Sequence, residues 1–194
     1  FLIPDRALRA PSSVVTVLKK AVIPAAGFGT RMLPIAKAIP KEMLPILDRP
    51  TIQYVVEELA EAEFTDVLLV TSREKKAIED HFDRAPELEQ RLAASKREHL
   101  LESIQKIAGQ LRIHSIRQPE QRGLGDAVRQ ARDHVGNEAF LCCLGDTLFS
   151  GDLLPARQLR DAHARLGTAV IGLERVEVEH VERIAAHMIR VTLG

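Results

Sequence analysis

The segment at residues 21–47 constrains the fold of this chain more than any other stretch. It begins with a short apolar strand at Val22 and Ile23 and passes directly into a turn that contains Gly27 and Gly29. A glycine-containing loop after a buried strand is where α/β folds bind phosphate groups, because glycine lets backbone N–H groups approach an anion closely. The segment therefore predicts an α/β fold with an anion site at the end of its first strand.

Basic residues follow the turn at Arg31, Lys37 and Lys41. The spacing GxGTRxxP followed by KxxPKExLP is more specific than an isolated GxG. It is not a Walker loop, which requires GK[ST], and it is not the dinucleotide fingerprint, because Met32 stands where the third glycine is required. We interpret Lys37 as a solvated helix charge and predict that Arg31 and Lys41 face a polyphosphate.

The rest of the chain alternates strands with helices. A stripe at Ile52, Val55, Val56 and Leu59 has the spacing of a helix packed on a sheet. We expect helices at 52–59, 75–82, 86–108, 123–135 and 154–166, and further strands at 66–72, 113–118, 139–144 and 168–173. This order predicts a three-layer, Rossmann-like α/β fold with a mainly parallel sheet flanked by helices, whose ligands bind beyond the carboxyl ends of the strands.

At 194 residues and 45% hydrophobic content, the chain can bury one core and is about one domain long. We expect residues 1–16 to be a loose extension and residues 17–194 to be a single domain. The first 50 residues hold eight Lys/Arg against three Asp/Glu, whereas the whole chain is neutral. A local excess of this kind indicates an anion site beside the glycine loop, with a merely solvated charge run as the alternative, and it argues against a nucleic-acid surface.

The adjacent residues Cys142 and Cys143 lie in the apolar run FLCCLG, which predicts a buried strand. Neighbours on a strand point to opposite faces, so we expect two core thiols and no disulfide, as in a reducing cytoplasm. No apolar stretch approaches the ~20 residues of a membrane span. The start of the chain, interrupted by Pro4 and charged residues, does not resemble a signal peptide.

Several motifs together resemble one enzyme family. They are the segment at 21–47, IQYVVEEL at 52–59, DVLLVTSREKKAIEDHFD at 66–83, RQPEQRGLGDAV at 117–128 and LGDTLFSGD at 144–152. In this order they resemble the sugar-1-phosphate nucleotidylyltransferases, in the branch that uses UTP and glucose 1-phosphate. The resemblance covers roughly residues 18–183. It implies transfer of a uridylyl group from UTP to glucose 1-phosphate, which gives UDP-glucose and pyrophosphate without a protein nucleophile.

The resemblance also assigns site residues. The backbone around Ala26, Gly27 and Gly29 would hold the nucleotide, and Arg31 and Lys41 would be the catalytic cations facing the triphosphate; for each of these two side chains the alternative is a surface ion pair.

Three further residues would bind the nucleoside. Glu42 would accept a hydrogen bond from it, with a helix cap or a salt bridge as the alternative. Gln118 would read the uracil edge together with Gly123, with a capping glutamine at a glycine-rich helix start as the alternative.

Asp146 ends the FLCCLGD strand and is the candidate metal ligand. One carboxylate with phosphate oxygens and waters is a common way to hold Mg²⁺, which is the cofactor that the resemblance implies. A turn aspartate at a strand end is the competing interpretation. The histidines show no ligand spacing.

The family resemblance ends near residue 183. Ile184 and Ala185 stand where the family has a Tyr-Gly pair of the sugar site, and nothing after them matches. We therefore expect the domain to be incomplete after about 183. Two alternatives to the uridylyltransferase stay open: a nucleotide-binding module without catalysis, and an enzyme for dTTP or another sugar phosphate. The apolar stripe of the helix expected at 86–108 is consistent with either core packing or a homo-oligomer interface.

Overall fold

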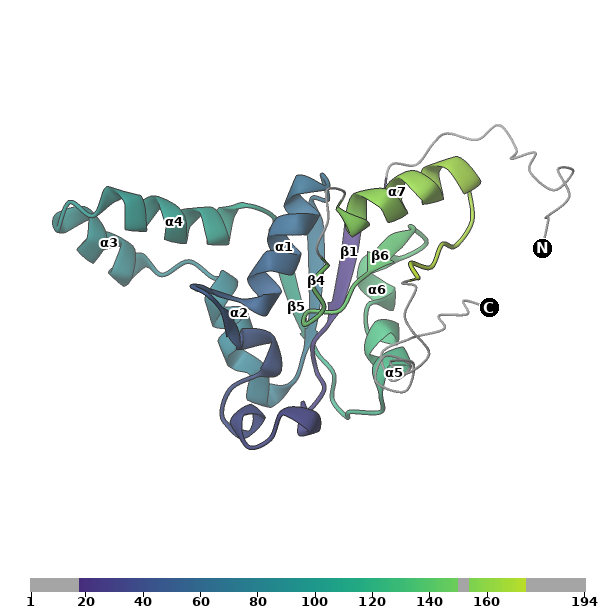
Figure 1. Cartoon of the computed structure of the whole chain (residues 1–194), viewed down its shortest axis with the longest axis horizontal. Coiled ribbons are helices and arrows are strands. Elements are labelled where there is room, and N and C mark those ends of the chain that lie inside the picture. Colours follow the sequence, from purple (N-terminus) through teal and green to yellow (C-terminus); the bar gives the residue numbers. More distant parts are fainter. Residues whose placement is uncertain (1–17, 150–153, 174–194) are drawn as a thin grey trace, which may run out of the picture.

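A four-stranded parallel sheet forms the centre of the protein. The computed structural model describes residues 18–149 and 154–173 (Figure 1). The strand order is β5-β4-β1-β6, and the strands are β1 (Lys20–Pro24), β4 (Asp66–Thr71), β5 (Arg112–Arg117) and β6 (Phe140–Cys142). All three pairings are parallel. With helices on both faces, this confirms the three-layer, Rossmann-like α/β architecture expected from the sequence.

The alternation of side chains along the two central strands explains the three layers. In β1, Ala21 and Ile23 belong to one hydrophobic core, whereas Val22 belongs to the other. β4 alternates in the same way, with Leu69 in the first core and Leu68 in the second. Successive side chains of a strand point to opposite faces, so a strand that is apolar at every position needs helices on both sides.

The first core is covered by α1 (Thr51–Glu61), α2 (Lys76–Phe82) and α7 (Pro155–Leu166). The second core is covered by α5 (Leu124–Arg129) and α6 (Arg132–Val135). The expected helices at 52–59, 75–82 and 154–166 correspond to α1, α2 and α7. None of the described helices is long and apolar enough to cross a bilayer.

The prediction of a single helix at 86–108 is wrong, because two helices occupy that segment. They are α3 (Pro86–Ala94) and α4 (Glu98–Gly109), which extend away from the sheet as a hairpin (Figure 1). The hydroxyl of Ser95 donates to the carbonyl oxygens of Arg91 and Leu92, and Lys96 adopts φ 55°. The Ser95 hydroxyl occupies carbonyl oxygens of the last turn of α3. The helix ends there because a residue in the left-handed conformation, here Lys96, cannot continue an α-helix. No residue of α4 is fully buried, although Ile107 is partly buried and packs against the first core.

The helix expected at 123–135 is also divided, since α5 ends before Gln130 and α6 begins at Arg132. The strand expected at 168–173 is absent. Ile171 and Leu173 there are 55% and 74% exposed, and that segment pairs with no described strand. An apolar run without a hydrogen-bonding neighbour does not become a strand.

Short elements surround the end of β1 and were not predicted. They are the 3₁₀ turns η2 (Thr30–Met32), η3 (Ile35–Lys37), η4 (Lys41–Met43) and η5 (Arg73–Lys75), and the small hairpin of β2 (Pro45–Ile46) and β3 (Arg49–Pro50). The predicted extension at 1–16 and the predicted incompleteness after about 183 lie outside the described residues.

Candidate functional site

The predicted site residues follow the carboxyl ends of three strands. Ala26 and Gly27 come after β1, Gln118 comes directly after β5, and Asp146 comes after β6. The sheet extends to β4 and β5 on one side of β1 and to β6 on the other. The crevice beyond the strands at such a reversal of order is where open α/β sheets bind ligands.

The loop after β1 is anchored to the sheet and then turns sharply. The N–H of Ala25 donates to the carbonyl oxygen of Val70 at 2.8 Å, and Ala26 is buried. Gly29 adopts φ 65°, and a Cβ there would lie 3.3 Å from the Cβ of Ala36 and 3.5 Å from the side chain of Lys41. Glycine at this position therefore lets the chain bring Lys41 back toward the sheet.

Two of the predicted site residues form an ion pair. The Nζ of Lys41 on η4 lies 2.6 Å from Oδ2 of Asp146, and both side chains are partly exposed. The predicted cation and the predicted metal ligand, 105 residues apart in the sequence, thus occupy one place. Arg31 on η2 is exposed and forms no ion pair with any described residue, so its guanidinium is available to an anion.

Glu42 forms a second ion pair, with Lys75, which is more deeply buried than the first. Both of its carboxylate oxygens accept from Nζ of Lys75 at 2.8 Å, and the two residues are 1% and 6% exposed. The salt-bridge alternative for Glu42 is therefore what the structure contains, and its contact with a nucleoside stays a prediction. Burial lowers the pKa of Lys75 from its ordinary value, and the Glu42 carboxylate opposes that shift.

Lys75 was not singled out from the sequence. Its neighbours Arg73, Glu74 and Lys76 are charged, so the sequence gives no sign that this lysine alone points inward. The lysine is also influenced electrostatically by Lys41 and Asp146, so the two ion pairs are neighbours.

Gln118 is buried, with 5% of its surface exposed. Its Nε2 donates to Oδ2 of Asp126 at 2.7 Å and to the carbonyl oxygen of Gly123 at 3.3 Å. The structure thus brings the predicted pair Gln118 and Gly123 into contact. The side chain of Gln118 does not cap the helix, because no side-chain hydrogen bond caps the start of α5.

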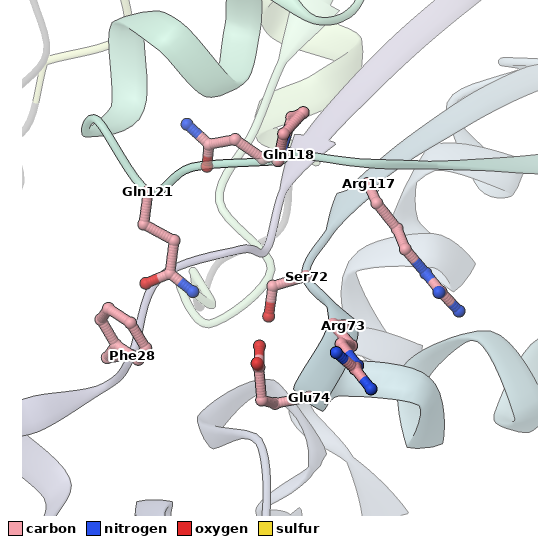
Figure 2. Close-up of a pocket in the computed structure, with 8 residues that line it drawn as sticks. Phe28, Ser72, Arg73, Glu74, Arg117, Gln118 and Gln121 are labelled. Atoms are coloured by element: carbon pink, nitrogen blue, oxygen red, sulfur yellow. The ribbon is translucent and has the colours of Figure 1, made fainter.

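A cavity of about 390 Å³ lies beside Gln118 at the ends of β4 and β5 (Figure 2). Its walls are Phe28, residues 72–74, residues 117–119 and Gln121. Two buried oxygen atoms here, Oγ of Ser72 and Oε1 of Gln121, have no hydrogen-bond partner. A buried polar atom without a partner is uncommon in folded proteins and indicates a place that a ligand or water completes. Of the residues that line this cavity, Gln118 alone is a predicted site residue, and Ser72 and Gln121 carried no signal in the sequence.

The described residues contain no group of three or more His, Cys, Asp or Glu side chains that could hold a metal ion. Asp146 therefore offers a single carboxylate. This donor set fits Mg²⁺, which keeps several waters and combines one or two carboxylates with substrate phosphates, and it does not fit a metal that needs an all-protein cage.

The two cysteines are free thiols, as expected. Burial raises the pKa of Cys142 to about 11 and raises that of Cys143 further above its ordinary value. Both thiols are protonated at neutral pH, so neither is a nucleophile.

Comparisons with known proteins identify the family of this chain. A family model described as nucleotidyl transferase matches residues 20–180. A UTP--glucose-1-phosphate uridylyltransferase from Bacillus subtilis is 48% identical over 166 residues, which are 86% of this chain and 57% of that protein. The chain therefore spans a little over half the length of the curated relatives it matches.

Solved structures give the same result. A UTP-bound UGPase from Acinetobacter baumannii is 42% identical with a TM-score of 0.71, over 75% of this chain and 52% of that one. A UDP-glucose pyrophosphorylase complexed with UDP-glucose is 38% identical with a TM-score of 0.73, over 84% of this chain and 60% of that one. A putative glucose-1-phosphate thymidylyltransferase from Bacillus anthracis is more distant, with 26% identity and a TM-score of 0.55, over 74% of this chain and 50% of that one. With a family model matched over most of its length, this chain belongs to the nucleotidyl transferase family.

Proposed function

We propose that this chain provides the nucleotide half of a Mg²⁺-dependent uridylyltransferase, which transfers a uridylyl group from UTP to glucose 1-phosphate and gives UDP-glucose and pyrophosphate. The observation that carries this proposal is the contact of Lys41 with Asp146 in the crevice beyond β1 and β6. A cation for phosphate and a carboxylate for a metal are the two groups that phosphoryl-type transfer needs in one place. The names and bound nucleotides of the similar enzymes support the same substrates.

The residues have separate tasks in this reaction. Backbone around Ala26 and Gly27 holds the nucleotide, and Arg31 offers a planar fork of donors to the β and γ phosphates. Lys41 neutralises the charge that gathers on the α-phosphate when the sugar phosphate attacks. Asp146 would hold Mg²⁺, which would supply further charge neutralisation to the phosphates.

The base would lie in the cavity beside Gln118, above the end of β4. Phe28 offers an apolar wall there, and Gln118, Ser72 and Gln121 offer polar atoms. Uracil and thymine present the same imide edge to such groups, so dTTP stays an alternative substrate. We place the reaction in the cytoplasm, in agreement with the unpaired cysteines.

A binding module without catalysis is the second candidate. Such a module binds UTP with Mg²⁺ but releases no pyrophosphate, alone or beside a partner that supplies the sugar-phosphate site.

The test is pyrophosphate release by the 194-residue chain with Mg²⁺, UTP and glucose 1-phosphate, repeated with dTTP. Asp146→Ala is expected to abolish turnover and to leave the melting temperature within a few degrees of the wild type, and Arg31→Ala is expected to lower the UTP-dependent rate. Equal turnover in Asp146→Ala would refute the role of that carboxylate. UTP binding without pyrophosphate release would favour the binding module.

A further inference from the structure

The orientation of the Gln118 carboxamide is fixed by its partners. The Oδ2 atom of Asp126 lies 2.7 Å from Nε2, and the carbonyl oxygen of Gly123 lies 3.3 Å from it. Both partners are hydrogen-bond acceptors, so only the NH₂ end of the amide can face them. The carbonyl oxygen Oε1 must therefore point the other way.

Asp126 is itself held in place. Its Oδ1 accepts from a guanidinium nitrogen of Arg129 at 3.0 Å, and its Oδ2 also lies 3.5 Å from Nε2 of Gln130. The hydrogen bond from Gln118 is the largest cause that holds the pKa of Asp126 below its ordinary value, and Arg129 adds to it. The carboxylate is consequently charged at neutral pH and cannot donate to Gln118.

The free end of the amide faces the cavity. Figure 2 shows Oε1 of Gln118 on the side of Gln121 and Ser72, and Nε2 pointing away from them. Among the described residues, Oε1 accepts no hydrogen bond, although Gln118 is 5% exposed. The cavity is thus presented with an acceptor whose orientation cannot reverse.

We propose that Asp126 determines the base specificity of the site by fixing Gln118 with its carbonyl oxygen toward the cavity, so that the site accepts a pyrimidine with a ring N–H and rejects cytosine. This inference rests on the proposed function, because it requires the base to bind beside Gln118. Asp126 is a positioning residue, since it reaches the base only through Gln118.

The chemistry of the bases explains the selection. Uracil and thymine carry a hydrogen on N3 between two carbonyl groups, so N3 donates to Oε1. Cytosine has an unprotonated N3, which is a hydrogen-bond acceptor. If cytosine took the same position, its N3 and Oε1 of Gln118 would be two acceptors facing each other. A site built to pair with an N–H rejects an analogue that lacks it, because the buried acceptor loses its partner. Uracil and thymine do not differ at this edge, so Gln118 does not distinguish UTP from dTTP.

The test measures binding of UTP, CTP and dTTP to the full 194-residue chain with Mg²⁺ by calorimetry. The variants are Asp126→Leu, which removes the acceptor, and Asp126→Asn, whose amide can face Gln118 with either end. The wild type is expected to bind UTP more tightly than CTP. In both variants the ratio of the CTP and UTP dissociation constants is expected to fall roughly tenfold, which corresponds to ~1.4 kcal/mol. The ratio for dTTP and UTP is expected to stay constant.

Asp133→Asn is the matched control, because Asp133 is an exposed aspartate on α6 that forms no side-chain hydrogen bond or ion pair within the described part of the chain. It makes the same chemical change nearby and is expected to leave both ratios unchanged. If the Asp126 variants melt like the wild type and keep its preference against CTP, the inference is overturned and the proposed function stands. If the wild type binds none of the three nucleotides, the proposed function fails and the inference with it.

Discussion

Replacement of Lys75 by methionine tests the organisation of the site most directly. The change keeps much of the apolar stem and removes the charge that both oxygens of Glu42 accept from. The carboxylate then remains in a place where it is 1% exposed. Lys75→Met is therefore expected to lower the free energy of unfolding sharply.

The magnitude follows from the burial of both partners. Removal of one member of a buried ion pair leaves an uncompensated charge and costs about 3–5 kcal/mol. In a domain of this size, each kcal/mol moves the melting temperature by about 2–4 °C, so the expected decrease is about 6–20 °C. The measurement is urea unfolding followed by circular dichroism, with thermal melting as a second readout.

A double-mutant cycle separates the pair from other effects of the substitution. The variant with both Lys75→Met and Glu42→Leu is expected to regain most of the lost stability, because it leaves no unpaired buried charge. Lys76→Met is the control. Lys76 is the next residue, pairs with Asp80 on the surface, and is expected to contribute less than about 1 kcal/mol. The claim that Lys75 and Glu42 form a buried, desolvated ion pair would be refuted by either of two results. One is a loss of less than about 1 kcal/mol in the free energy of unfolding of Lys75→Met, and the other is no recovery of stability in the double variant.

Three further outcomes are expected. Gly145→Ala places a Cβ 3.2 Å from Cγ2 of Ile23 and should cost about 1–3 kcal/mol in urea unfolding, whereas unchanged stability would show that the strand end can move away. Leu59→Ala, at a 1% exposed position, should cost about 2–5 kcal/mol in the same assay. A hydrogen bond from Arg84 lowers the pKa of Glu89 to about 2, so its contribution to stability is complete above the unfolded pKa of about 4.5 and is lost as the pH falls through 2. Glu89→Gln should therefore flatten the acid dependence of the melting temperature between those pH values.

The sheet could be predicted because its central strands carry their pattern in adjacent residues. Ala21, Val22 and Ile23 are apolar without interruption and are fully buried. A run of this kind is typical of a strand covered on both faces, and the helical stripe that follows at 52–59 specifies a crossover. Both signals are local, so a single sequence contains them.

The errors in the fold concern segments whose structure depends on distant neighbours or on one side chain. The apolar positions from Leu88 to Ile107 continue across Ser95, so periodicity gives no sign of the break that the Ser95 hydroxyl and the left-handed Lys96 produce. Ile171 lies in a segment with the composition of a strand, but no described strand pairs with it. The strand propensity of a segment shows only that it can form a strand, and the neighbouring segments that it pairs with determine whether it does.

The candidate site divides in the same way between residues that we propose to face a ligand and residues that hold them in place. Gln118 and Asp146 could be singled out as candidates, because parallel strands place their carboxyl ends at one edge and polar residues are conspicuous there, and Lys41 could be singled out by the motif that follows the glycine turn. Lys75 and Asp126 could not, because each is one charge among several on a helix or turn, and only its hydrogen bond to a residue outside that element, Glu42 or Gln118, selects it. Glu42 and Lys75 are 33 residues apart, so no short motif contains both. The buried partners nevertheless fix the geometry of the visible ones, since a carboxamide or an ammonium group acts specifically only when its orientation is held. Substitutions at these hidden positions should therefore change selectivity and stability before they change the capacity to bind phosphate.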